Sequence, residues 1–178
     1  YIAAQNGHEK IVELLLKDTR IDPNQAYKNL VTPLFVASQN GYEPIIKLLL
    51  KDKRTDVNKA RTDIGSTPLF LASSKGYDSI VKLLIDNGAN VNAPTKSGAI
   101  ALHSSSFYGH IDVVNQLLNA GAELSSKTNY GDTAKSLAKK NGHTDVSKLI
   151  EEFSKSKIQS NKTIISFSII FVSNILVI

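Results

Sequence analysis

Residues 65–93, GSTPLFLASSKGYDSIVKLLIDNGANVNA, place apolar side chains at helical spacing in two short runs. The first run follows Thr67, whose hydroxyl can cap a helix, and Pro68, which suits a first helical position. Gly76 can take the left-handed conformation that ends this helix. The second run, at about 78–87, carries a broad apolar face. The pattern predicts two short helices joined by a tight turn, followed by an extended loop.

Such a unit cannot be stable alone, because helices of this length are marginal in water and its two apolar faces need outside partners. The pattern therefore predicts flanking copies of the unit, and the sequence contains them. The glycine that ends the first helix recurs as Gly7, Gly41, Gly76, Gly109 and Gly142, at intervals of 34, 35, 33 and 33 residues by subtraction.

Several motifs repeat with this glycine. The tripeptide Thr-Pro-Leu occurs at 32–34 and 67–69, and each recurring glycine is followed by His or Tyr. The second-helix core recurs as Ile/Val pairs followed by Leu pairs, and one unit closes with NGANVNA at 87–93. On these residues the chain resembles the ankyrin repeat family, from residue 1 to about 153.

The resemblance implies an all-α fold, an α-solenoid of stacked helix–turn–helix repeats joined by β-hairpin loops, with a concave face. It also implies a module that binds other proteins. We expect a repeat array of about five units over 1–153, with the first one truncated, a polar linker over 154–162 and a hydrophobic tail over 163–178. Because the chain has no methionine and Tyr1 falls inside a repeat, we expect further repeats upstream in the parent protein.

Composition narrows the function. The net charge is +5, but Lys155, Lys157 and Lys162 contribute three of these charges, so the repeats are nearly balanced and show no basic stripe typical of nucleic-acid binding. The absence of cysteine excludes disulfides and fits a reducing compartment. We expect an intracellular, cytoplasmic monomer that binds a protein partner and no nucleic acid.

The apolar run after Lys162, TIISFSIIFVSNILVI, permits three interpretations. It can be a short C-terminal membrane anchor, although a helix of fifteen residues spans only about 22 Å of a hydrocarbon core of about 30 Å. It can be a non-native extension, or an element folded back on the last repeat. A membrane-tethered adaptor is therefore the alternative to a soluble interaction module.

No catalytic constellation stands out. His8, His110 and His143 share a repeated position that holds tyrosine elsewhere, and His103 lies in the position of Phe35 and Phe70. The glycines recur at the repeat period and have no phosphate-binding spacing. We expect no enzyme activity, no metal and no cofactor.

The resemblance also implies the positions that contact a partner, at the hairpin tips and in the two residues before each helix-ending glycine. At the tips these positions hold Lys28, Asn29, Asp63, Ile64, Lys96, Ser97, Asn129 and Tyr130. At the helix ends they hold Gln39, Asn40, Ser74, Lys75, Phe107, Tyr108, Lys140 and Asn141. Leu30 replaces a glycine found in the other complete units, so we expect its tip to differ in shape.

The fourth unit departs most from the pattern. Ile100 and Ala101 replace Thr-Pro, which predicts the least stable first helix of the inner units. Phe107 and Tyr108 form an aromatic pair where other units have small, polar or charged residues. This pair is either a partner contact or, for Phe107, a compensation for the serines at 104 and 105.

Overall fold

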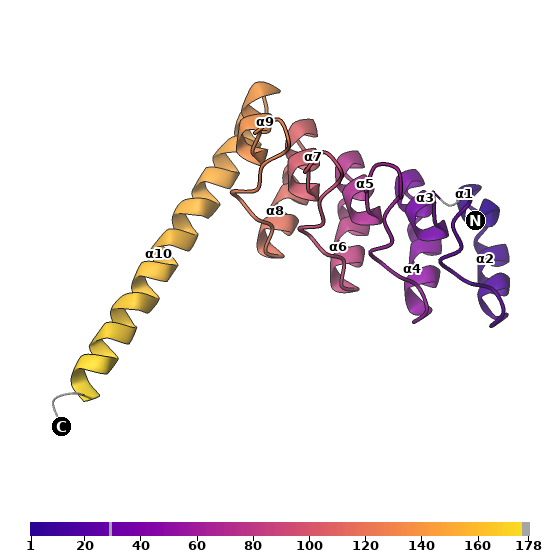
Figure 1. Ribbon diagram of the computed structural model, residues 1–178, viewed down its shortest axis with the longest axis horizontal. Coiled ribbons are helices and arrows are strands. Elements are labelled where there is room, and N and C mark those ends of the chain that lie inside the picture. Colours follow the sequence, from indigo (N-terminus) through magenta and orange to yellow (C-terminus); the bar gives the residue numbers. More distant parts are fainter. Residues whose placement is uncertain (29, 176–178) are drawn as a thin grey trace.

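The computed structural model describes residues 1–28 and 30–175, with side chains as far as Gln159. The described chain forms helices that alternate between two layers (Figure 1). One layer contains α1 (Ile2–Gln5), α3 (Pro33–Asn40), α5 (Pro68–Lys75), α7 (Ala101–Tyr108) and α9 (Ala134–Lys140). The other contains α2 (Glu9–Leu16), α4 (Glu43–Lys51), α6 (Asp78–Asp86), α8 (Ile111–Asn119) and the start of α10 (Thr144–Ile175).

Each helix packs against the partner in its own unit and against the equivalent helices of the units on either side. The result is the expected all-α solenoid, a row of helix–turn–helix units (Figure 1). The array ends on α9 and the first turns of α10, which pack on the fourth unit. In the described part of the chain, the main helix contacts lie within a unit or between neighbouring units, so each unit depends on the next for its buried surface.

The local signals in the sequence set the helix boundaries. The side-chain oxygen of Thr32 accepts the amide of Phe35 at 3.1 Å, and that of Thr67 accepts the amide of Phe70 at the same distance. Prolines occupy the first turns of α3, α4 and α5. The helices α3, α5 and α7 end on left-handed glycines, as their spacing predicts.

Gly76 shows why glycine recurs at this position. Its φ of +71° lies in the left-handed region, and a Cβ atom there would lie 2.6 Å from Nδ1 of His110 in the next unit. The ring of His110 also bonds through Nε2 to the carbonyl oxygen of Ser74 at 3.1 Å. The residues after the later glycines, Tyr42, Tyr77, His110 and His143, are thus structural contacts between units.

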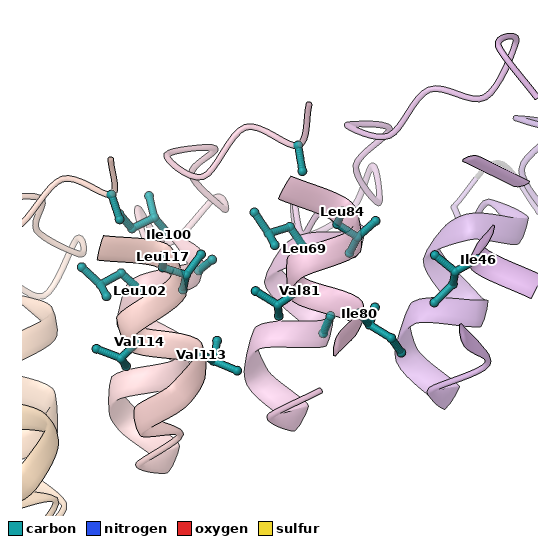
Figure 2. Close-up of a cluster of buried hydrophobic side chains, with 14 of the residues drawn as sticks. Ile46, Leu69, Ile80, Val81, Leu84, Ile100, Leu102, Val113, Val114 and Leu117 are labelled. Carbon is teal, nitrogen blue, oxygen red and sulfur yellow. The ribbon is translucent and has the colours of Figure 1, made fainter. Parts of the chain in front are cut away.

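The core is continuous along the array. Ile80, Val81 and Leu84 of α6 are at most 2% exposed. Figure 2 shows them between the equivalent side chains of α4 and α8, including Ile46 and Val114. The apolar face of every inner second helix is therefore buried partly by its neighbours and not by its own unit alone.

The loops that lead into the first helices are tight turns. The amides of Tyr27, Thr95 and Thr128 each donate to the carbonyl oxygen four residues ahead. The expected β-hairpins are short, since the described residues contain one isolated antiparallel bridge, Tyr27 with Val31, and no longer strand pairing. Lys28 has φ +50°, the one positive φ of a non-glycine residue among those described. The tip that contains Leu30 thus differs in shape, as expected.

Asparagines at 34-residue intervals join successive junctions. The side-chain nitrogen of Asn58 donates to the carbonyl oxygen of Gly88 at 3.2 Å, and its oxygen accepts the amide of Asn90 at 2.8 Å. Asn24 and Asn92 make the same two kinds of bond to the junctions that follow them. We call Asn24, Asn58 and Asn92 the asparagine ladder.

Arg54 lies in the junction between α4 and α5 and bonds to the junction that precedes it. Its guanidinium pairs with Asp52 at 2.6 Å and donates to the carbonyl oxygens of Leu16, Thr19 and Ile21 in the preceding unit. These bonds satisfy carbonyls at the end of α2 that a glycine turn would otherwise cover. Arg54 thus forms an arginine clamp between the first two junctions.

Residues 154–162 are helical and belong to α10, although the sequence predicts a linker. No glycine or proline interrupts the chain after Gly142, and Glu151 pairs with Lys155 at 2.8 Å one turn ahead. The distal part of α10 extends away from the repeats in Figure 1 and does not fold back on them. Among the described residues, no helix is both long enough and apolar enough to cross a membrane.

Candidate protein-interaction surface

The predicted contact positions lie on one side of the array, along the turn tips and the ends of the first-layer helices (Figure 1). All the described ones are exposed except Ser74, which is half-buried. The prediction for Asn29 lies outside the described residues. These positions form a row because the units that carry them repeat.

The last three tips are bonded into one ridge. The amide of Lys96 donates to the carbonyl oxygen of Ile64 at 3.0 Å, and the amide of Asn129 donates to that of Ser97 at 2.8 Å. The side chain of Asn129 adds a bond to the carbonyl oxygen of Lys96 at 3.0 Å. Asn129 thus has a structural role, while Tyr130 beside it is 86% exposed.

Two carboxylates on this side are engaged by basic neighbours. Asp63 pairs with Arg61 at 2.7 Å, and Asp132 pairs with Lys140 at 2.5 Å. The hydrogen bond from each basic side chain lowers the pKa of its carboxyl partner. Both carboxylates therefore stay charged and already have partners within the chain.

Phe107 and Tyr108 are the last two residues of α7, the first-layer helix of the fourth unit. Phe107 is 42% exposed and Tyr108 is 54% exposed. Their rings meet edge to face at 4.9 Å, and the Tyr108 ring stacks on His110 at 6.0 Å. The backbone is fixed by His143, whose Nε2 bonds the carbonyl oxygen of Phe107 at 3.0 Å. The His143 bond braces the backbone of the pair. The contact between the two rings leaves both of them partly exposed.

His103 lies beneath this surface and is 1% exposed. The amide of Ile100 donates to its Nδ1 at 3.2 Å, so Nε2 carries the proton and faces the carbonyl oxygens of Ser126 and Asp132 at 3.0 and 3.2 Å. Burial lowers the pKa of His103. Its ring connects the start of α7 to the tip of the fifth unit, and the repeat pattern alone does not reveal this bond.

Metal-binding side chains do not cluster in the described part of the chain. It contains no group of three His, Asp or Glu side chains placed to hold a metal ion. A cavity of about 560 Å³ lies at the first unit among apolar side chains such as Val12, Leu16 and Leu49. The surface can contact a partner through exposed aromatic and lysine side chains.

A stack of helix–turn–helix units with such a surface is typical of repeat solenoids that bind other proteins. The chain matches the family described as Ankyrin repeats (3 copies) over residues 1–61 and 53–128. It belongs to the ankyrin repeat family, whose members are generally protein–protein interaction modules. The comparison with curated proteins gave no match. The fifth unit lies outside the matched residues, but α9 begins with a Thr133 cap of the same kind.

The asparagine ladder was missed by sequence reasoning, although a signal for it exists. Asn24, Asn58 and Asn92 are separated by 34 residues each, which is the period of the units. A polar residue kept at the repeat period in a junction indicates a bond between units. Arg54 carries the same kind of signal, because Arg20 precedes it by 34 residues and Asp18 precedes Asp52 by the same interval, but the spacing does not show that its acceptors are backbone carbonyls of the preceding unit.

Proposed function

We propose that this chain binds a protein partner through the tips and first-layer helix ends of its third to fifth units, with Phe107 and Tyr108 as the central anchor. The observation that supports this proposal is the exposure of both rings on a braced backbone. Rigid aromatic side chains bury large areas at low entropic cost and are enriched among binding hot spots. The contacts require no catalysis and no cofactor.

The test is the double substitution Phe107→Ala with Tyr108→Ala. Because about half of each side chain is exposed, the melting temperature should stay within about 2 °C of the parent, as for other surface changes. Partner affinity should fall by at least about tenfold, which corresponds to about 1.4 kcal/mol. Quantitative affinity capture from cell extract measures this loss, protein by protein.

The matched control is Ile111→Ala with Asp112→Ala, a neighbouring exposed pair at the start of α8. Proteins that the parent and the control both retain, and that the aromatic variant loses, are partners of the proposed surface. A large drop in melting temperature with capture unchanged would instead assign Phe107 and Tyr108 to packing, and the proposal would be wrong.

A further inference from the structure

The near-neutral charge of the array conceals a separation between its two sides. We define the tip side as residues 1–8, 26–42, 60–77, 94–110 and 127–143, which carry the turn tips and the first-layer helices. The junction side is the rest of 1–153, with the second-layer helices and the junctions. The tip side has eight basic residues and two acidic ones, and the junction side has ten and fourteen. By subtraction the sides carry +6 and −4.

The separation is sharpest from residue 60 onward. On the tip side this part carries Arg61, Lys75, Lys96, Lys127, Lys135, Lys139 and Lys140 against Asp63 and Asp132. Seven minus two gives +5. On the junction side it carries Lys82 and Lys148 against Asp78, Asp86, Asp112, Glu123, Asp145, Glu151 and Glu152, which gives −5. The net charge of these three units is therefore zero, with the excess positive charge on the tip side and the excess negative charge on the junction side.

The ion pairs leave part of the positive charge available. Both tip-side carboxylates of these units are held by Arg61 and Lys140, and Lys135 is paired with Glu151. Among the described residues, Lys75, Lys96, Lys127 and Lys139 are exposed and take part in no ion pair. Four lysines therefore face solvent without an acidic partner in the chain.

Lys75 is the unpaired lysine beside Phe107 and Tyr108. It ends α5, which packs against α7, and packed helices are about 8–10 Å apart, so its side chain reaches the neighbourhood of the aromatic pair. Lys96 lies at the turn tip that leads into α7, whereas Lys139 lines a hollow with residues of α10. An apolar anchor beside unpaired positive charge complements an acidic segment that contains a large apolar residue.

We infer that the partner of this surface presents such a segment: an apolar side chain seated against Phe107 and Tyr108, with neighbouring carboxylates that pair with Lys75 and Lys96. This inference rests on the function proposed above and narrows its partner class. A nucleic acid fits less well, because the unpaired cations near the aromatic pair are lysines and Arg61, the one arginine on this side, is already paired with Asp63.

The experiment is a selection from a displayed library of random peptides, of about 15 residues each, on the whole chain. Clones that also bind the Phe107→Ala, Tyr108→Ala variant are removed. The expected pool is enriched in Asp and Glu around a Leu, Phe, Trp or Tyr. The affinity of a synthetic selected peptide should fall at least about tenfold between 50 and 300 mM NaCl, because salt screens exposed charges.

Two charge variants locate the effect. Lys75→Gln with Lys96→Gln removes unpaired tip-side charge, and the peptide should bind at least about tenfold more weakly. The matched control, Lys47→Gln with Lys82→Gln, removes the same net charge from the junction side, where each lysine pairs with a carboxylate one turn away. The control should bind within about twofold of the parent.

The outcomes separate the inference from the proposed function. A pool that depends on Phe107 and Tyr108 but lacks acidic enrichment overturns the inference and leaves the proposed function standing. A selection that yields no such dependent clones contradicts both. A single-stranded oligonucleotide of about 20 nucleotides that binds as tightly as the best peptide, and that also requires the aromatic pair, would assign the surface to nucleic acid and overturn the inference.

Discussion

The helices α5 and α7 occupy the same place in successive units but begin in different ways. In α5 the start is fixed locally, because the Thr67 oxygen accepts the Phe70 amide and a proline follows Thr67. In α7 neither residue is present, and the Ile100 amide donates instead to His103. That ring also contacts the turn of the next unit. The comparison shows that a missing local cap can be replaced by a bond that joins two units.

The largest effect should come from His103→Ala. The substitution leaves the buried Ile100 amide and the Ser126 carbonyl oxygen without this partner, which costs about 1–3 kcal/mol for each buried polar group left unsatisfied. Thr67→Ala removes one cap and should cost about 0.5–2 kcal/mol. Urea unfolding of both variants measures the two values. A smaller loss for His103→Ala than for Thr67→Ala would show that the ring does not replace the cap.

The second prediction is that His103 in α7 makes the free energy of unfolding decrease in mild acid, whereas α5 contributes no such dependence. Burial lowers the pKa of His103 in the folded chain below its usual value of 6.5, and protonation would also remove the lone pair that accepts the Ile100 amide. The neutral ring therefore contributes stability that is present above about pH 6.5 and is lost as the pH falls below it. Unfolding free energies measured between pH 7.5 and 5 test this loss.

His103→Gln is the matched variant for the pH experiment, because glutamine does not titrate. Its stability should change less over the same range. The paired carboxylates act in a lower window: Lys135 and Lys155 lower the pKa of Glu151 to about 2, so that contribution is lost only below about pH 4.5. Equal losses in the parent and in His103→Gln between pH 7.5 and 5 would contradict the role given to His103.

A proline restored to α7 should have a smaller, stabilising effect. Ala101 begins α7 where Pro33 and Pro68 stand in the first turns of α3 and α5. The residue before it, Ile100, has φ −102° and ψ 171°, a conformation compatible with a following proline. Ala101→Pro should raise the free energy of unfolding by about 0.4–1 kcal/mol, because it restricts the unfolded chain. A loss of stability would mean that the buried site cannot accept the ring.

The smallest difference should be seen in amide exchange. The helix α7 lacks a hydroxyl cap, and the Ser105 hydroxyl bonds the carbonyl oxygens of Ala101 and Leu102, at 3.2 and 3.3 Å, within its first turns. Amides of residues 101–108 should exchange faster at neutral pH than those of 68–75, as measured by mass spectrometry or NMR. Slower exchange in α7 would show that the His103 bond more than replaces the threonine cap.

The contrast between these helices also marks what the sequence could predict. The Thr67 cap, the glycine end at Gly76 and the extent of α6 follow from signals within a few residues, and the structure confirms them. The His103 bond, the Arg54 clamp and the asparagine ladder join groups about 23 to 38 residues apart, where local patterns carry no direct information. The sequence predicts a linker at 154–162 because apolar residues there lack helical spacing. In the structure, α10 continues through these residues.

The resemblance to ankyrin repeats implies the contact positions, including Phe107 and Tyr108, and their contact role stays a prediction. The sequence could not show whether the two rings are exposed. The charge separation was hidden by counting charges along the chain, because tip-side lysines and junction-side carboxylates alternate in sequence and cancel. Only the arrangement of the units in two layers sorts them into opposite surfaces.

The asparagine ladder has a mechanical consequence. Each of Asn24, Asn58 and Asn92 connects one junction only to the next, so a tensile load applied at the two ends passes through the rungs in series. When one rung yields, its neighbours keep their own bonds and continue to bear the force. A tensile load should therefore open the bonds between junctions one at a time, and force–extension measurements would show such openings as separate steps.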